Sequence, residues 1–481
     1  MLASHGPCTG VVNLPRAGLP ADHGLASLGL VMQLTGRTTG ALAALVASLA
    51  LLDTRIHHVS PWFWPWFCVA AALCFARSQL HRIAGRDLTY SRYTVEGKPA
   101  DPFEATGTYV LFALGHAIGM GLVATLVFDA PRRTAAAITA ALVLWPCVLA
   151  TVCRLRRYRP LRAGIPLAED RSLEGASIVM TVLGVHGLLS TGVIVVMLGA
   201  LSRHHRQHGW GAMFGVMFVL LAARSLLHVR AGVAGLRDVS FDRPGELAAR
   251  YATFGVISAF CVGGMLALLA MSERLTPEAI AGIAVVCWLL VTWPMIVKRF
   301  FHHRQFVELL AGDRVIHRRA PDAGLTGLGW LLAGHVVLVA TLALLDGGVH
   351  QMPGRALASV VGTGRLVLGP WWAVSPKLGA LVVGLELACA VALIRMSDTR
   401  RAIATLYSLV TCGLTLVMAI PAFREVSHHA DLPTAIRLLP YAAQLVLPAA
   451  ALLLVHRTVA PTARARYRRL PATPDRPRPA A

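Results

Sequence analysis

Long apolar stretches alternate with short polar, arginine-containing stretches along almost the whole chain. Each apolar stretch is about 17–25 residues long, which is the length an α-helix needs to cross the hydrocarbon core of a bilayer. The pattern predicts an all-α, polytopic transmembrane bundle of about twelve spans arranged as six hairpins. The first helices of the hairpins are expected at Leu25–Leu52, Tyr109–Phe128, Ser177–Leu201, Ala252–Met271, Leu325–Leu345 and Ile403–Ile420. The second helices are expected at Phe63–Leu80, Ala135–Cys153, Met213–Leu227, Ile280–Val297, Leu378–Ile394 and Leu438–Val455.

The composition agrees with this membrane interpretation. Of 481 residues, 56% are hydrophobic and only 14% are charged, whereas soluble domains carry about 25% charged residues. The mean hydropathy is +0.62. A chain with so few charged side chains cannot cover its apolar helices with a water-compatible surface, so these helices are expected to face lipid.

One short sequence occurs twice at the polar end of a predicted span. Ala76–Gly85 reads ARSQLHRIAG and Ala223–Gly232 reads ARSLLHVRAG. Each copy is followed by a similar segment, Arg86–Tyr90 in the first and Arg237–Phe241 in the second, which is expected to be a linker. Arg395, before Met396 and Ser397, is interpreted as the corresponding arginine of a third copy.

A second marker has the same spacing. Trp145-Pro146, Trp293-Pro294 and Leu447-Pro448 lie in three other predicted spans. Together the two markers predict three tandem four-helix modules, at 22–169, 170–321 and 322–460, between an N-terminal tail of residues 1–21 and a basic, Pro- and Arg-rich tail of residues 461–481. Pro146, Pro294 and Pro448 are expected to kink their helices. The shared kink either lines a common feature, such as a cavity, or is an inherited shape without a function of its own.

The distribution of positive charge predicts the orientation. Most Lys and Arg residues fall on the side of the two chain ends, and short loops rich in Lys and Arg stay in the cytoplasm. Both termini are therefore expected to be cytoplasmic, in a plasma or inner membrane. The net charge of +21 is then explained by arginine clusters that meet anionic lipid headgroups, and nucleic acid is not expected as a partner.

Five ionisable residues fall inside predicted spans, where burying a charge costs several kcal/mol unless it is paired or hydrated. They are the candidates for a substrate or proton path: Arg37, His116, His186, His335 and Glu386. Glu386 is the hardest to explain as packing, and it is expected to pair with Arg37 or a histidine or to stay protonated. The alternative for each histidine is a single interhelical hydrogen bond that only joins two helices.

Catalytic motifs are absent from the sequence. It contains no GxxxxGK[ST], GxSxG or HExxH motif, so ATP-driven, esterase and metalloprotease activities have no support, and the chain is not expected to be an enzyme. Neither a metal site nor a particular cofactor is predicted from the spacing of Cys and His.

Three function classes remain open. The first is a secondary transporter or channel-like protein for a small solute, with the five intramembrane residues near the membrane midplane. The second is a non-enzymatic membrane scaffold or assembly partner that works through its basic cytoplasmic segments. The third is a haem- or metal-binding redox protein that uses His116, His186 and His335.

Overall fold

A computed structural model describes residues 24–52, 63–90, 94–95, 98–99, 103–126, 130–155, 158, 173–204, 210–237, 242–272, 277–302, 324–349, 375–395, 397–428 and 438–457. This part of the chain is helical apart from a pair of two-residue strands, β1 (Thr94–Val95) and β2 (Lys98–Pro99). The two predicted tails, residues 1–21 and 461–481, lie outside the described residues.

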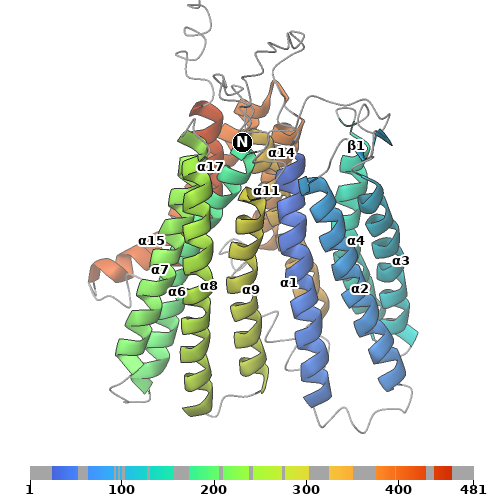
Figure 1. The fold of residues 1–481 in the computed structure, drawn as a ribbon, viewed down its shortest axis with the longest axis horizontal. Coiled ribbons are helices and arrows are strands. Elements are labelled where there is room, and N and C mark those ends of the chain that lie inside the picture. The colour runs from blue at the N-terminus through green and yellow to red at the C-terminus, as the bar shows by residue number, and fades with distance from the viewer. Residues whose placement is uncertain are drawn as a thin grey trace, which may run out of the picture.

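The described residues form twelve helices that run alongside one another (Figure 1). The first four are α1 (Leu25–Leu52), α2 (Phe63–Tyr90), α3 (Glu104–Leu126) and α4 (Arg132–Cys153). The next four are α6 (Leu173–His204), α7 (Trp210–Arg237), α8 (Asp242–Ser272) and α9 (Pro277–Phe301). The last four are α11 (Leu325–Val349), α14 (Pro376–Ile394), α15 (Arg400–His428) and α17 (Leu439–Arg457). We refer to these groups as helix sets 1, 2 and 3.

Six of the helices contain segments long and apolar enough to cross a membrane. They are Glu104–Leu126, Arg132–Cys153, Gly211–Leu236, Gly245–Leu268, Lys377–Ile394 and Arg400–Pro421. Large apolar side chains on these helices point outward, and Leu111, Leu126 and Phe260 are 76%, 78% and 71% exposed. Water disfavours an apolar surface of this extent, whereas lipid accepts it. These helices therefore indicate insertion into a membrane.

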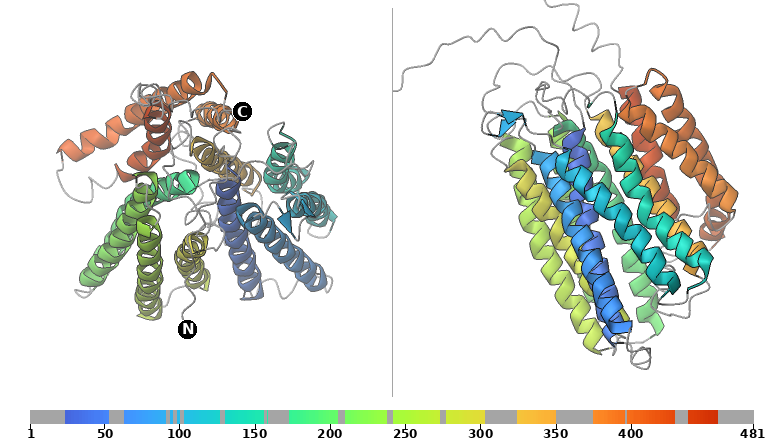
Figure 2. Two further views of the ribbon diagram at one scale, coloured as in Figure 1. Left: turned by 45° about the horizontal axis from the view of Figure 1, so that its top comes forward. Right: turned by 90° about the vertical axis from the view of Figure 1, so that its right-hand side faces the viewer.

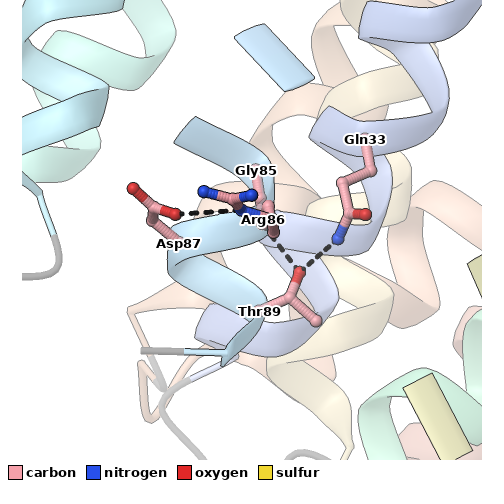
Figure 3. A network of polar contacts seen from close by, with 5 residues as sticks. All are labelled: Gln33, Gly85, Arg86, Asp87 and Thr89. Carbon is pink, nitrogen blue, oxygen red and sulfur yellow. Dashed lines mark hydrogen bonds and ion pairs between the residues drawn. The ribbon is translucent and has the colours of Figure 1, made fainter. Parts of the chain in front are cut away.

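The predicted ends of several helices were wrong. Arg86–Tyr90, expected in a linker, belongs to α2. Leu88 is buried there, and Gln33 Nε2 of α1 donates a hydrogen bond to Thr89 Oγ1 over 2.8 Å (Figure 3). Thr89 Oγ1 in turn donates to the carbonyl of Gly85 over 2.7 Å. Packing against α1 thus continues the helix through a polar sequence that hydropathy alone assigns to a loop.

Contacts between helices follow the same plan in each set. The first helix packs on the second, the second on the third, and the third on the fourth. Between sets, the first helix of one meets the fourth helix of another, as α1 with α9, α6 with α17 and α11 with α4. These three contacts close a ring.

The first helices of the three sets also contact one another, and they lie in the middle of the bundle (Figure 2). A Cβ atom on Gly327 of α11 would lie 2.6 Å from the Cα atom of Gly175 in α6 and 2.8 Å from Ser27 Oγ in α1. Only a residue without a side chain lets the three backbones approach this closely.

We expect Gly327→Ala to destabilise the bundle, because the new methyl group meets the backbone of α6, which cannot rotate away. A matched Gly→Ala control is Gly115→Ala in α3, where a Cβ atom would have nothing within 4 Å. Thermal unfolding in detergent should show a lower midpoint for Gly327→Ala. Gly115→Ala should be unchanged or slightly stabilised, since Ala in an exposed helix gains about 0.5–1 kcal/mol over Gly. Equal midpoints for the two variants would contradict the central contact.

Candidate functional site

The proline within α4 determines the first polar cluster inside the bundle. Pro146 has no backbone N–H, so the carbonyl of Leu142, four residues earlier, loses its helical donor. Arg77 of α2 supplies a replacement: its Nη2 donates to the Leu142 carbonyl over 2.5 Å. Its Nη1 donates to the carbonyl of Ala113 in α3 over 3.4 Å. The guanidinium therefore joins three helices of set 1.

Set 2 contains the same arrangement at the corresponding residues. Pro294 of α9 frees the carbonyl of Leu290, and Arg224 Nη2 of α7 donates to it over 2.5 Å. Arg224 Nη1 donates to the carbonyl of Gly255 in α8 over 3.2 Å. Arg77 and Arg224 are each only 7% exposed, so both charges are held inside the protein by backbone dipoles.

A histidine follows each arginine by one helical turn. His81 Nε2 accepts a hydrogen bond from Trp145 Nε1 over 2.7 Å, and the imidazole stacks on Tyr109 at 4.5 Å between ring centroids. His228 bonds in the same way to Trp293 over 3.0 Å and stacks on Tyr251 at 4.4 Å. These residues and the arginines form what we call arginine clusters 1 and 2.

The tryptophan bond fixes the charge state of these histidines. An indole N–H can only donate, so the Nε2 atom that accepts it carries a lone pair, and the imidazole is neutral. Each arginine cluster therefore contains one positive charge, that of its arginine.

Helix packing locates the corresponding place in set 3. A Cβ atom on Gly29 of α1 would lie 2.5 Å from the Gly85 carbonyl oxygen of α2, and one on Gly329 of α11 would lie 3.1 Å from the Ala390 carbonyl oxygen of α14. Ala390 thus occupies the position of Gly85. One turn before it, Glu386 takes the position of His81, and another turn earlier Val382 takes the position of Arg77.

The other helices of set 3 carry the rest of the pattern. Tyr407 of α15 precedes Thr411 by one turn, as Tyr109 precedes Ala113, and both tyrosines are fully buried. Pro448 lies within α17 and frees the carbonyl of Gln444. In set 3, therefore, the arginine is replaced by a valine that cannot donate to this carbonyl, and the neutral histidine is replaced by a carboxylic acid.

A cavity of about 20 Å³ lies at this place, and we call it the Glu386 cavity. Its polar lining comes from His186, His335, Glu386, Tyr407, Thr411 and Gln444. Glu386 is 2% exposed, and its Oε1 atom lies 2.8 Å from His335 Nδ1. The Oγ1 atom of Thr411 is buried and has no hydrogen-bond partner.

The five residues singled out from the sequence do not form one cluster. His186, His335 and Glu386 meet at the Glu386 cavity, and Glu386 pairs with a histidine, as one of its two expected partners. Arg37 is half-buried on α1, where the nearest charges are those of Arg82 and Arg299.

His116 lies in α3, with Nδ1 3.3 Å from Arg77 Nη1 and Nε2 3.6 Å from Cys74 Sγ. The three histidines proposed for a redox site are therefore not brought together. In the part of the chain that the structure describes, His, Cys, Asp and Glu side chains do not form a group of three or more placed to hold a metal ion.

Sequence reasoning missed the most important positions. The sequence marks Arg77 and Arg224 only as parts of a repeat, and the prediction that Arg395 is their counterpart in set 3 is wrong. Arg395 follows the last residue of α14, whereas Arg77 and Arg224 lie well inside their helices. The sequence signal for these arginines is the residue four positions before each proline. Its carbonyl has lost its helical N–H donor and therefore needs another donor.

Comparison of the chain with protein-family models, with curated proteins and with solved structures found no match.

Two substitutions in arginine cluster 2 test whether Arg224 stabilises the bundle through the carbonyl that Pro294 frees. Arg224→Met leaves the proline-freed carbonyl of Leu290 without its donor, at a cost of about 1–3 kcal/mol for a buried group left unpaired, whereas the Gly255 carbonyl keeps the Ser258 hydroxyl as a donor over 3.0 Å. Adding Pro294→Ala returns a backbone N–H to α9, which can donate to the Leu290 carbonyl. We expect the double variant to recover part of the stability lost in Arg224→Met.

The free energy of unfolding in mixed detergent micelles measures this cycle, with Pro294→Ala alone as the reference. Strictly additive effects of the two substitutions would show that Arg224 does not act through the proline-freed carbonyl.

Proposed function

We propose that the chain is an integral membrane protein with twelve crossings, built from three tandem four-helix modules around a pseudo-threefold axis along the membrane normal. The modules correspond to 22–169, 170–321 and 322–460. The closed ring of contacts between helix sets and the like construction of arginine clusters 1 and 2 support this proposal. Repeats with an even number of crossings share one orientation, which places their symmetry axis along the membrane normal.

In this proposal both termini are cytoplasmic, in the plasma or inner membrane, and the arginine-rich segments contact anionic lipid headgroups. Alkaline phosphatase fused after Gln207, between α6 and α7, should be active because that segment lies outside the cell. The same enzyme fused after Pro99, between α2 and α3, should be inactive. Equal activity of the two fusions would contradict the topology.

We further propose that the protein is a secondary transporter or channel-like protein for a small solute. The observation that carries this function is the buried Glu386–His335 pair, which faces a cavity inside the bundle. A carboxylate within a membrane protein is costly, and such groups typically line ion or substrate paths. A pair that served only to hold α11 on α14 would have no need of the adjoining polar cavity.

A larger, apolar groove lies beside the Glu386 cavity and opens at the surface of the bundle, where Leu453 is 67% exposed. It has a volume of about 460 Å³, lies between α6, α7 and α17, and is lined mainly by Val, Leu, Ile and Ala. Helices α6 and α17 border both the Glu386 cavity and this groove. Binding sites of transporters are often built at the interface between repeats, and α6 and α17 belong to different helix sets.

The transport proposal is tested by removing the charge of Glu386 without changing its shape. We expect Glu386→Gln to lower proton or solute flux into proteoliposomes at least tenfold, because the amide cannot exchange a proton or carry a negative charge. Flux is followed with an entrapped pH dye under an imposed potential and with a panel of radiolabelled small solutes.

Glu104→Gln is the matched control, since Glu104 is exposed at the start of α3. It should transport like the unmodified protein. Liposomes containing the unmodified protein that are no more permeable than empty ones, or an unchanged flux in Glu386→Gln, would refute the proposal.

A further inference from the structure

The charged group beside the proline-freed carbonyl differs between the first two helix sets and the third. In arginine clusters 1 and 2, a guanidinium satisfies the proline-freed carbonyl and brings one positive charge. In set 3 the corresponding carbonyl is that of Gln444, the arginine position holds Val382, and Glu386 brings a negative charge. With His335 neutral and donating its Nδ1–H to the Glu386 carboxylate, the formal charge of the place changes from +1 to −1, and the carbonyl of Gln444 still lacks its helical donor.

A second, independent observation points to a ligand at this place. Thr411 occupies the position of Ala113 and Gly255, which have no side-chain oxygen. Thr411 is 3% exposed and lines the Glu386 cavity, and its Oγ1 atom has no hydrogen-bond partner. Leaving a hydroxyl buried and unpaired costs about 1–3 kcal/mol. Unlike the similarly unpartnered Thr106, Thr411 lies at a polar cavity, where a ligand can bond to its hydroxyl.

The volume of the cavity and the oxygen atoms around it indicate which kind of ligand fits. A volume of about 20 Å³ holds one water molecule or a bare ion of similar size. The oxygen atoms of a carboxylate, a hydroxyl and a carbonyl suit hard cations. A single carboxylate balances one positive charge, and a divalent cation would leave an uncompensated charge inside the protein.

We propose that the Glu386 cavity binds one dehydrated sodium ion, held by oxygen atoms of Glu386, Thr411 and Gln444, in the place that a guanidinium group takes in arginine clusters 1 and 2. Freed carbonyls of interrupted helices are recurrent ligands for Na⁺ in membrane transporters. The inference deepens the proposed function and rests on it for the position of the site in the membrane. It assigns a coupling ion to that site.

The test measures Na⁺ binding directly, on the full-length chain in detergent, without a gradient or a solute. Saturable binding of ²²Na⁺ is expected, with competition by unlabelled Na⁺ and none by choline. Thr411→Val, which removes only the hydroxyl, should weaken binding about tenfold, and Glu386→Gln should abolish it. Thr106→Val is the matched control, because Thr106 of α3 is equally buried with an unpartnered hydroxyl but lies away from the cavity.

A third variant tests the relation between the helix sets. Val382→Arg places a guanidinium where arginine clusters 1 and 2 have one, so it should abolish Na⁺ binding while the protein stays folded. Val382→Met adds similar bulk without charge, and it should bind Na⁺ more tightly than Val382→Arg. Because Val382→Arg can fail to fold, Thr411→Val provides the independent measurement.

The outcomes separate this inference from the transport proposal. Saturable Na⁺ binding that depends on Thr411 and Glu386 supports the sodium site even if no solute is transported. Absence of saturable ²²Na⁺ binding overturns the sodium site even if flux in proteoliposomes depends on Glu386. Binding that stays within twofold of the unmodified protein in both Thr411→Val and Glu386→Gln also overturns it, because the ion would then be held elsewhere.

Discussion

A backbone carbonyl that has lost its helical donor needs another donor wherever water cannot reach it. Proline creates this need at Leu142, Leu290 and Gln444, in the fourth helix of each helix set. In sets 1 and 2 an arginine from the second helix meets it and simultaneously bonds to the third helix. One guanidinium thus links the second, third and fourth helices. One turn away, a histidine stacks on a tyrosine and accepts a hydrogen bond from a tryptophan.

Set 3 keeps the proline and the tyrosine but changes the groups between them. Val382 and Glu386 replace the arginine and the neutral histidine, and His335 of α11 pairs with the carboxylate. The first helices of the sets meet through small residues at the centre of the bundle, and His335 and His186 reach the cavity from two of these helices. The place that joins helices in sets 1 and 2 corresponds, in set 3, to the location of the sodium site that we propose.

The sequence was sufficient to predict the twelve helices, because each contains an apolar stretch of the length that an α-helix needs to cross a bilayer. The ends of α2 and α7 could not be predicted, since polar residues there continue the helix by packing on α1 and α6. The cost of burying a carboxylate singles out Glu386 in the sequence, and the structure buries its side chain. Its partner could be named only as Arg37 or a histidine, because the choice depends on how α11 and α14 face one another.

Other parts of the site needed three-dimensional information. Thr411, Tyr407 and Gln444 look like ordinary residues of apolar helices, and only the arginine clusters show what their positions mean. His116 and Arg37 were grouped with Glu386 by their depth along the helices, yet depth does not determine which side of a helix a residue occupies. Their separation from the cavity follows from the direction in which α3 and α1 present them.

A structure determined by electron cryomicroscopy in lipid nanodiscs would test the central claim most directly. The account predicts that the guanidinium groups of Arg77 and Arg224 lie within the hydrocarbon layer, bonded to the carbonyls of Leu142 and Leu290, with Glu386 and Gln444 around a small cavity at the same depth. Guanidinium groups turned outward to the lipid headgroups, with the proline-freed carbonyls bonded to other partners, would contradict it.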